Sequence, residues 1–373
     1  MEKESPMDIG VPKERRQYEF RVGLSPAGVE VLCHQDHHCF IEHEAGVGAG
    51  FSDQDYINAG AKIVYSPEEA YGRADLVLKF SRPLQYELEW IRPEKALAGF
   101  LYLASSRQDR IDTLLEKKIT SIAWEQIELR DGSRPVLGAI SRIGGLMTAQ
   151  IAARLLMNNE GGKGIMLGGL PGVPPAEVVI IGAGTAGENA ARAFLGLGAH
   201  VTVLDQSIEA LRKIYYQFPN LSTMVSTERN IARSCAFADV VIGAVNIPGE
   251  RAPIIVKRAV VQKMKPRSVI IDLSIDQGGC FETSRPTRHD HPTYVEERVI
   301  HYCVPNIPGV VARTSTHAFM NFSLPYISEL ANGGIEKAIE TNPSIAAAIN
   351  THNGKINNLA RFNISKEEYH GSE

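Results

Sequence analysis

The stretch VVIIGAGTAGENAARAFLGLGAHVTVLD (residues 178–205) joins an apolar run, three glycines, a helical segment and a second apolar run that ends in an acid. Gly182, Gly184 and Gly187 have the spacing G-x-G-x-x-G directly after the first run, which predicts a strand, a tight turn and a helix. Gly182 permits the turn, Gly184 lets the backbone approach a ligand, and Gly187 lets helix and strand pack closely. The free N–H groups and the dipole at the start of the helix favour a phosphate. The stretch therefore predicts a parallel α/β domain that binds a dinucleotide.

Asp205 closes the second apolar run of this stretch. An acid at this place accepts hydrogen bonds from both ribose hydroxyls, and its charge repels a 2′-phosphate, so we expect NAD rather than NADP. The alternative is a glycine turn that packs an α/β unit and binds no ligand. Because strand, helix and terminal acid all fall in the required places, the dinucleotide site is the favoured interpretation.

Short apolar runs alternate with helical segments on both sides of this stretch. In SPAGVEVLCHQD, the serine is a suitable N-cap for a helix. Repeated strand, helix and strand predict parallel sheets covered by helices, so the expected fold class is α/β with two Rossmann-like parallel-sheet domains. The expected strands are residues 7–12, 38–44, 61–66, 76–80, 96–103 and 121–125 in a first series, and 177–184, 200–205, 238–245, 268–274 and 299–304 in a second.

A segment rich in glycine and proline, residues 161–178, separates the two series. Before it, residues 141–159 have apolar side chains at helical spacing and predict a long connecting helix. From Thr314 onward the pattern is helical again. Spacing leaves open whether this tail returns to the first domain.

Length and composition are those of an ordinary globular protein. A chain of 373 residues suggests two or three domains, and a formal net charge of −4 does not attract nucleic acid or an anionic membrane. The N-terminal MEKESPMDIGVPKERR lacks the apolar core of a signal peptide, and no apolar run is long enough to span a bilayer. The five cysteines are scattered without a CxxC pair, which favours free thiols. We expect a cytoplasmic protein without nucleic-acid or membrane partners.

Histidines cluster in two parts of the sequence, but neither cluster has further ligands at the spacing that a metal site needs. His289 and His291 are two residues apart in a polar loop, which favours a structural or solvated pair. Cys280 and Cys303 have no identifiable His or Asn partner, so a nucleophilic thiol is a minor interpretation. No metal is expected. The second group of histidines comprises His34, His37, His38 and His43.

Three charged residues lie at strand ends or in short loops, where parallel sheets bind their ligands. Arg21 lies in YEFRVGLSP, and its guanidinium suits a carboxylate. Lys79 ends the run LVLKF and suits polarising a carbonyl or holding a carboxylate; a lysine is costly to bury without a partner. Asp276 follows IIDLS in the second domain. Each alone is more simply explained by a surface ion pair, and their joint placement favours a site.

Five stretches of the chain together carry a resemblance to a known family. They are GVPKERRQYEFRVGLSPAGV, ADLVLK, GGLPGVPPAEVVIIGAGTAG, IDLSIDQGGCFETSRPT with HDHPTY, and YCVPNIPGVVARTST. With them the chain resembles the alanine dehydrogenase family, which also includes the NAD-binding subunit of proton-translocating transhydrogenase. The resemblance covers nearly the whole chain. SIDQGG and the run CFE-SRPT-DHPT resemble the dehydrogenases more than the transhydrogenase subunits.

The resemblance implies a discontinuous substrate domain, residues 1–135 and 313–373, and an NAD-binding domain, residues 136–312, linked by a long helix. It implies a hexamer. By resemblance Arg21 binds the substrate carboxylate, Lys79 contacts the carboxylate or keto oxygen, and Asp276 positions the water or ammonia and the nicotinamide. The remaining cofactor contacts implied in this way are Ser141, Thr185, Ala186, Val245, Leu273, Ser274, Ile275, Arg285, Val304, Asn306 and Ile307, besides Asp205 and the three glycines.

One position departs from the family pattern F-x-H-L-A, in which the histidine is the general acid/base. Here the aligned residues read FLYLA (100–104), so that Tyr102 replaces the histidine. Histidine has an ordinary pKa of about 6.5 and a phenol one of about 10, so tyrosine is the poorer match at neutral pH. Tyr102 can still donate a hydrogen bond to a carbonyl oxygen, or act as a base if Lys79 lowers its pKa.

Three functions follow from this sequence. The first is an NAD-dependent dehydrogenase that oxidises a small L-amino acid to a 2-oxo acid and ammonia; a variant keeps the hydride transfer on a different amino, imino or oxo acid. The second is an NAD(H)-binding protein that has lost its acid/base. The third, a transhydrogenase subunit, predicts a tail leading to a membrane span, whereas the chain ends in the polar SKEEYHGSE (365–373).

Overall fold

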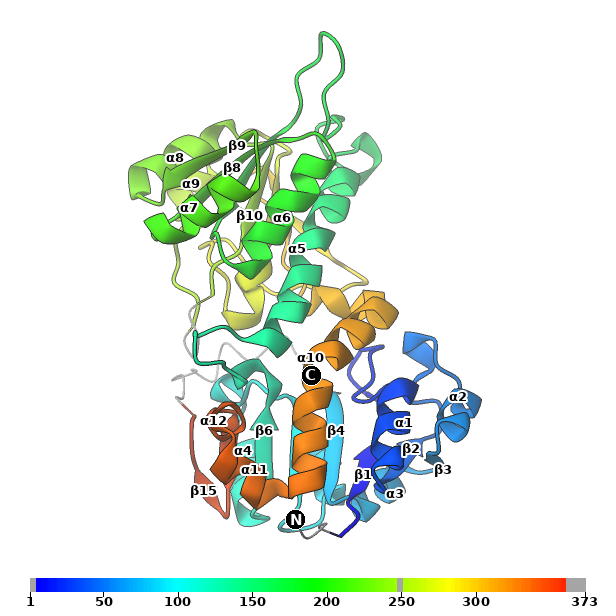
Figure 1. Cartoon of the computed structure of the whole chain (residues 1–373). Helices are drawn as coiled ribbons and strands as arrows, with labels where there is room; N and C mark the ends of the chain where they lie inside the picture. Colours follow the sequence, from blue (N-terminus) through cyan, green and yellow to red (C-terminus); the bar gives the residue numbers. More distant parts are fainter. Residues whose placement is uncertain (1–4, 247–250, 360–373) are drawn as a thin grey trace. The chain divides into compact units, whose positions relative to one another are not determined.

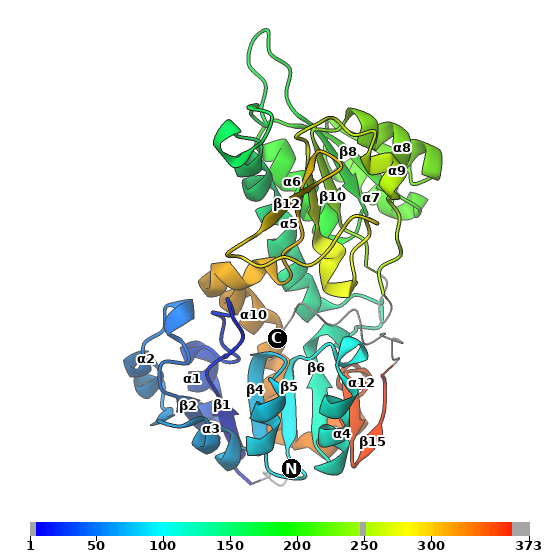
Figure 2. The same ribbon diagram turned by 180° about the vertical axis from the view of Figure 1, so that it is seen from behind.

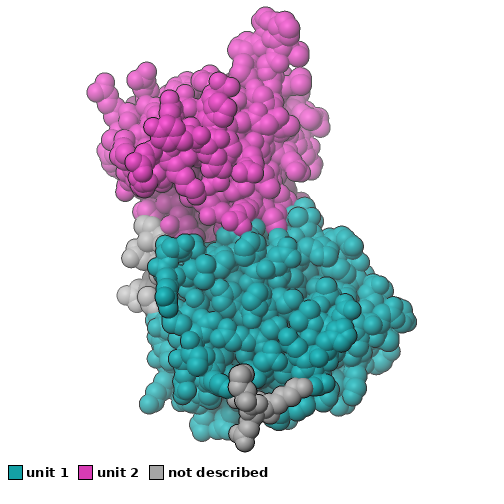
Figure 3. Space-filling view, viewed as in Figure 1, with its two compact units in different colours: residues 1–140, 308–368, 372–373 teal, residues 141–307, 369–371 magenta. Residues whose placement is uncertain are grey.

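The computed structural model describes residues 5–246 and 251–359, and these form two compact units. Of these residues, unit 1 comprises 5–140 and 308–359, and unit 2 comprises 141–246 and 251–307. Figure 3 shows the two units in different colours. The segment after Pro308 therefore returns to the first unit. The polar stretch 365–373 lies outside the described residues.

Unit 1 is built on a sheet whose order in the described residues is β15-β14-β6-β5-β4-β1-β2-β3. The strands β1 to β6 are parallel, whereas β14 is antiparallel to β6 and β15 is antiparallel to β14. Their bounds are β1 Asp8–Val11, β2 His38–Glu42, β3 Lys62–Val64, β4 Leu76–Ser81, β5 Ala96–Phe100, β6 Thr120–Ala123, β14 Ile349–His352 and β15 Lys355–Ile356.

Helices cover both faces of this sheet (Figures 1 and 2). Alternate strand residues point to opposite faces: Leu78 packs in the larger core with Phe319 of the long helix α10, whereas Val77 packs on the other face with Leu114 of α4. Ser25 caps α1 by accepting from Gly28 N, which confirms the predicted N-cap. The helices are α1 Pro26–His34, α2 Asp53–Asn58, α3 Pro67–Arg73, α4 Gln108–Glu116, α10 Ala312–Gly333, α11 Ile335–Thr341 and α12 Pro343–Ala347, with 3₁₀ turns η1 Val47–Ala49, η2 Gln85–Trp90, η3 Leu103–Ser105, η4 Trp124–Gln126 and η7 Ile307–Val311.

Unit 2 has a second sheet, ordered β12-β13-β11-β10-β7-β8-β9 in the described residues. All its pairs are parallel except that of β12 with β13. The bounds are β7 Glu177–Ile181, β8 His200–Asp205, β9 Leu221–Val225, β10 Val240–Gly243, β11 Val269–Asp272, β12 Thr293–Glu296 and β13 Val299–Tyr302. The helices are α6 Thr185–Gly196, α7 Ile208–Gln217, α8 Glu228–Phe237 and α9 Arg258–Val261, with 3₁₀ turns η5 Asn158–Glu160 and η6 Leu273–Gln277.

The long helix α5, Pro135–Leu155, contains the boundary between the two units. It begins six residues earlier and ends four residues earlier than the predicted connecting helix. Within unit 2, Ala149 and Ala152 of α5 pack with Phe194 of α6 over one face of the sheet. By length and composition alone α5 could cross a membrane, which is weak evidence because core helices of soluble proteins pass the same test.

Each sheet reverses its strand order at one place, between β1 and β4 in unit 1 and between β7 and β10 in unit 2. In parallel sheets the loops at the carboxyl ends of two such strands diverge to opposite faces and leave a crevice for a ligand. The predicted fold class, two mostly parallel sheets with flanking helices, is confirmed. The short strands β9, β12, β14 and β15 were not predicted, and the strand predicted at 96–103 ends at Phe100.

Candidate active site

Two glycines shape the turn after β7 in unit 2. Gly182 has φ +111°, and a Cβ there would lie 2.3 Å from the Ala244 carbonyl oxygen at the end of β10. A Cβ on Gly187 would lie 1.9 Å from the carbonyl oxygen of Gly182. Because neither position has room for a side chain, the turn and the close approach of α6 to the strand require glycine at both.

Gly184 differs from its two neighbours in the motif. Its φ is −74°, and a Cβ on it would meet no atom within 4 Å. Nothing within the protein therefore requires glycine at this position, whereas a ligand that lies against the backbone would. As the N-cap of α6, Gly184 supplies no side-chain acceptor to the first-turn N–H groups. These features fit a dinucleotide pyrophosphate.

Asp205, the last residue of β8, holds the same turn from the side. Its Oδ2 accepts the Ala183 N–H at 2.7 Å, and its Oδ1 accepts the Ser207 N–H at 2.7 Å. These two bonds fix the carboxylate beside the glycine turn. Each oxygen has a further lone pair with which it can accept a ribose hydroxyl.

Asp272, a residue that the sequence analysis missed, organises the next loop of unit 2. It is fully buried at the end of β11 and accepts from Ser274 N (3.0 Å), Cys280 N (2.9 Å) and Ser284 Oγ (2.7 Å). Burial raises its pKa, and these bonds oppose the rise. Ser274 Oγ in turn accepts from Val245 N at 3.0 Å. The sequence does contain a signal for Asp272, because it is an acidic residue at the end of a predicted buried strand, in IIDLS.

The other predicted residues of unit 2 fall into two groups. Asp276, in η6, accepts from Asn306 N at 3.2 Å, which joins the loops after β11 and β13. Arg285 instead stacks at 3.9 Å over the ring of Tyr294 and lies 3.4 Å from Glu296, both of β12. Of the remaining positions, Ser141 lies in α5, Thr185 and Ala186 begin α6, Leu273, Ser274 and Ile275 lie in η6, and Val304 and Ile307 are buried after β13.

Lys79 is fully buried in β4 of unit 1, two residues before the strand ends. Its Nζ lies 2.8 Å from Glu87 Oε1 and 3.3 Å from Glu14 Oε2. The Tyr71 hydroxyl also donates to Glu87 Oε1, at 2.8 Å. The partner that a buried lysine requires is therefore a pair of carboxylates, one from the loop after β1 and one from η2.

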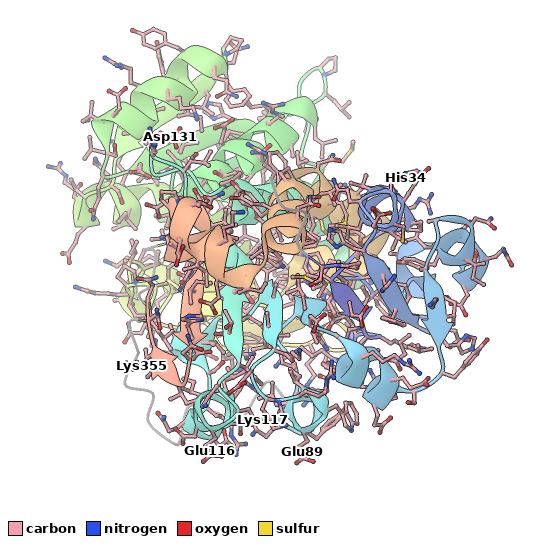
Figure 4. The ribbon with its side chains drawn as sticks, turned by 60° about the horizontal axis from the view of Figure 1, so that its bottom comes forward. His34, Glu89, Glu116, Lys117, Asp131 and Lys355 are labelled. Carbon is pink, nitrogen blue, oxygen red and sulfur yellow. The ribbon has the colours of Figure 1, made fainter. Side chains whose placement is uncertain are left out.

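Lys117, whose side chain lies beside Glu89 in Figure 4, fixes η2 and with it Glu87. Its Nζ donates to the carbonyl oxygens of Leu88 (2.8 Å), Glu89 (2.7 Å) and Ile91 (3.0 Å). These carbonyls lie at the end of η2, where a short helix leaves acceptors without internal donors; the Leu88 carbonyl also accepts the Ile91 N–H at 3.3 Å.

Glu14 joins β1 to β4 at the reversal of strand order. Its Oε1 accepts the N–H groups of Phe80 (2.7 Å) and Ser81 (3.2 Å), where the register of β4 with β5 is irregular. Burial raises the pKa of Glu14 to about 7, against the lowering effect of Lys79. The carboxyl group thus titrates near neutral pH beside a buried ammonium.

Arg21 is buried and bound by Glu19, which accepts from its Nε and Nη2. The guanidinium carbon lies 3.7 Å from the centroid of the Phe80 ring, a cation–π contact. Burial tends to raise the pKa of Glu19, but the charge and hydrogen bonds of Arg21 outweigh this and lower it. A substrate carboxylate would have to approach the guanidinium from a side other than the one that Glu19 occupies.

Tyr102 lies two residues beyond β5 in the left-handed region, with φ 42° and ψ 45°. This conformation is strained for a residue with a side chain, and such strain gathers at functional sites. Glu125 of η4 holds it: its Oε1 accepts Tyr102 N at 2.6 Å and its Oε2 accepts Leu101 N at 3.1 Å. The strand ends here because the backbone turns to meet this carboxylate.

Glu125 predicts a dependence of stability on pH. Burial raises its pKa to about 7, against its backbone hydrogen bonds. In the unfolded chain the same carboxyl group ionises near pH 4.5. The folded state therefore favours the protonated group, which stabilises the fold at low pH. We expect this contribution, about 3 kcal/mol, to be lost as the pH rises to 7. Urea unfolding at several pH values measures this: the free energy of unfolding should fall less steeply with rising pH in Glu125→Gln than in the wild type. Glu14 contributes in the same direction, so part of the fall should persist. Equal slopes would contradict the assignment, and Glu128→Gln is the control, because Glu128 is only partly buried and pairs with Arg134 near the surface.

Family models match most of the chain. The model of the alanine dehydrogenase/PNT N-terminal domain matches residues 10–144, and that of the C-terminal domain matches residues 148–359. The chain belongs to the alanine dehydrogenase/PNT family.

Relatives within the alanine dehydrogenase/PNT family are similar over nearly their whole length. Alanine dehydrogenase of Methanococcus maripaludis is 46% identical over 352 residues, 94% of either chain, and that of Mycobacterium tuberculosis is 44% identical over 351 residues, again 94% of either chain. A solved L-alanine dehydrogenase has a TM-score of 0.90 at 43% identity and covers 94% of this chain and 96% of its own. A transhydrogenase from Sinorhizobium meliloti, at 23% identity, shares the fold with a TM-score of 0.79 and coverage of 94% and 98%.

Proposed function

We propose that this chain is an NAD-dependent amino-acid dehydrogenase that converts a small L-amino acid to a 2-oxo acid and ammonia, and that it can run the reverse amination. The observation that carries the proposal is the fully buried Lys79 at the strand-order reversal of unit 1, held between Glu87 and Glu14. Relatives named alanine dehydrogenase, at 46% and 44% identity, support it. Substrate groups are assigned to unit 1 and cofactor groups to unit 2.

In unit 2 the residues present fit NAD. Gly184 leaves the backbone open to a pyrophosphate, α6 directs N–H groups at it, and Asp205 accepts from the ribose. Bound NAD supplies the hydride acceptor. Asp276 is assigned to positioning the water or ammonia and the nicotinamide.

In unit 1 each residue has an assigned task. Arg21 binds the substrate carboxylate and is kept in place by Glu19 and by the Phe80 ring. Lys79 donates to the keto oxygen or to the carboxylate, and its charge favours negative charge on that oxygen. Tyr102 donates a hydrogen bond to the reacting oxygen from a backbone position fixed by Glu125.

Two alternatives differ in what Tyr102 does. In the first, the chain transfers hydride to or from a different amino, imino or oxo acid, for which a phenol is the suitable donor. In the second, the chain binds NAD(H) without turnover. We further propose a cytoplasmic homo-oligomer, a hexamer by its resemblance to the family; light scattering with chromatography tests this assembly.

A substrate screen on Tyr102 variants tests the function. Following NADH absorbance with L-amino acids and 2-oxo acids, we expect turnover by the wild type and a fall in kcat of about 10²-fold or more for Tyr102→Phe, because the proton donor is lost. Tyr102→His should recover activity, since the imidazole titrates near neutral pH. Tyr86→Phe, on the half-exposed Tyr86, is the matched control. Unchanged kcat in Tyr102→Phe would remove Tyr102 from the chemistry, and NADH binding without any turnover would favour the non-catalytic alternative.

A further inference from the structure

The buried ammonium of unit 1 lies between two buried carboxyl groups. Lys79 Nζ is 2.8 Å from Glu87 Oε1 and 3.3 Å from Glu14 Oε2, and all three side chains are buried. One ammonium balances the charge of one carboxylate, and a second buried carboxylate without its own counter-charge is costly. One of the two carboxyl groups is therefore the natural place for a proton, and their hydrogen bonds decide which.

Glu87 has the donors that an ionised carboxylate accepts. Its Oε1 accepts from Lys79 Nζ and from the Tyr71 hydroxyl, both at 2.8 Å, and its Oε2 accepts the Leu84 N–H at 2.6 Å. Arg15 Nη1 adds a second positive charge at 4.0 Å from Oε1. Since both oxygens act only as acceptors, Glu87 is the counter-charge of Lys79.

Glu14 has a different set of contacts. Its Oε1 accepts the N–H groups of Phe80 and Ser81. Its Oε2 is buried and has no hydrogen-bond partner within the part of the chain that the structure describes, although it faces Lys79 Nζ. A proton on Oε2 removes a buried charge and leaves both bonds to Oε1 intact. Oε2 of Glu14 is therefore the atom on which the proton resides.

The surroundings of Glu14 let this proton leave and return near neutral pH. Burial raises the pKa of Glu14 to about 7; the charge of Lys79 lowers it, and the charges of Glu19 and Glu87 raise it. A phenol ordinarily titrates near pH 10, so Tyr102 suits a hydrogen bond to the reacting oxygen better than a proton transfer at neutral pH. Further titratable side chains that interact with Glu14 are Arg16, in the loop after β1, and Tyr71, in α3.

We propose that Glu14 holds the proton that Lys79 passes to the reacting oxygen of the substrate, and that Glu14 takes this proton back in the reverse reaction. The inference rests on the proposed dehydrogenase function and adds a residue to it. Glu14 acts through Lys79, so its task is to supply and position a proton on Nζ.

The proton transfer balances in both directions. In the amination, the lone pair of ammonia forms the C–N bond and the C=O π pair moves to oxygen. The oxygen takes a proton from Lys79 Nζ, the Oε2 proton of Glu14 replaces it on Nζ, and Glu14 is left as a carboxylate. A proton from nitrogen then leaves with the hydroxyl group as water. Oxidative deamination reverses each step and returns the proton to Glu14.

Profiles of kcat against pH test the proposal with pyruvate, saturating ammonia and NADH, and with L-alanine and NAD, or with the best pair from the substrate screen. Amination should slow as the pH rises above about 7, because Glu14 must start protonated; deamination should speed up as the pH rises to about 7, because Glu14 must start ionised. In Glu14→Gln both dependences should disappear and kcat should fall about 10²-fold or more. Glu89→Gln, on an exposed residue of η2, is the control and should keep the wild-type profile.

Infrared spectroscopy of the enzyme without substrate follows the proton itself. The C=O stretch of a protonated carboxyl group should be lost as the pH rises through about 7, and Glu14→Gln should remove part of this change. Glu125→Gln should remove another part, because burial raises the pKa of Glu125 to about 7 as well. Lys79→Met should move the Glu14 part to higher pH, since the charge of Lys79 lowers the pKa of Glu14.

The outcomes separate the two proposals. Turnover with a pH profile that Glu14→Gln leaves unaltered would overturn the inference while leaving the dehydrogenase in place. If Glu14→Gln does not fold, Glu14→Asp decides, because a displaced pH dependence supports the inference and an undisplaced one overturns it. If no substrate turns over, the proposed function fails, and the infrared change decides: a Glu14 band that Lys79→Met displaces supports a proton on Glu14, and no such band overturns it. NADH binding, which uses groups of unit 2, and urea unfolding show that each variant is folded.

Discussion

Lys79→Met is expected to abolish turnover and to lower the free energy of unfolding by about 3–5 kcal/mol. Methionine keeps the length of the side chain but leaves Glu87 and Glu14 facing each other, buried and without the ammonium. The same loss removes the charge that favours a negative oxygen in the transition state. Urea unfolding and the NADH-linked assay measure the two effects separately.

The loss of stability in Lys79→Met should shrink as pH falls below about 7. Glu14, whose pKa burial raises to about 7, takes up a proton in that range and no longer needs a counter-charge. Lys95→Met is the matched control, because Lys95 pairs with Asp75 at 2.8 Å but is 30% exposed, and exposed pairs contribute about 1 kcal/mol or less. A Lys79 variant that is as stable as the Lys95 variant would show that the buried carboxylates do not depend on Lys79.

Gly187→Ala should disrupt unit 2, whereas Gly184→Ala should spare its fold and weaken its cofactor binding. The added Cβ at Gly187 would lie 1.9 Å from a carbonyl oxygen, so α6 must move away from β7. We expect a loss of about 3 kcal/mol of stability and no measurable NADH binding. The Cβ at Gly184 has free space, so the melting temperature should hold while the Kd for NADH rises about tenfold or more. Fluorescence titration with NADH and thermal melting measure both.

Gly196→Ala provides the control for the glycine pair. A Cβ at Gly196, within α6, also meets no atom within 4 Å, so it should alter neither melting nor NADH binding. Gly184→Ala with wild-type NADH affinity would contradict the pyrophosphate position, and stable Gly187→Ala would show that helix and strand can separate without cost.

The sequence predicted those parts of the molecule that local pattern encodes. Apolar runs of period two and the G-x-G-x-x-G turn lie within single segments, and Ser25 is an N-cap for local reasons. The hydrogen bond that Thr351 N donates to Ser121 Oγ joins residues 230 apart, and no run near either one indicates that β14 pairs with β6. Strands β9 and β12 lie at the edges of their sheet, where half-exposed positions weaken the apolar pattern.

The candidate site shows the same limit. Arg21, Lys79 and Asp276 could be singled out because a charge at a strand end is visible in one segment. The partners of Lys79 and Tyr102 could not, since Glu87 lies in η2 and Glu125 follows β6.

The return of the chain to unit 1 after Pro308 bears on how the protein is made. The ribosome synthesises residues 141–307 as one uninterrupted segment, whereas unit 1 also needs the residues after Pro308. Unit 2 can therefore fold before unit 1 does. Until α10 emerges, Phe80, Phe100 and Trp124 lack Phe319, against which all three rings pack. Every nascent chain thus passes through an interval in which an aromatic surface of unit 1 is open to solvent, and chaperones or aggregation compete for that surface until the last fifth of the sequence has been translated.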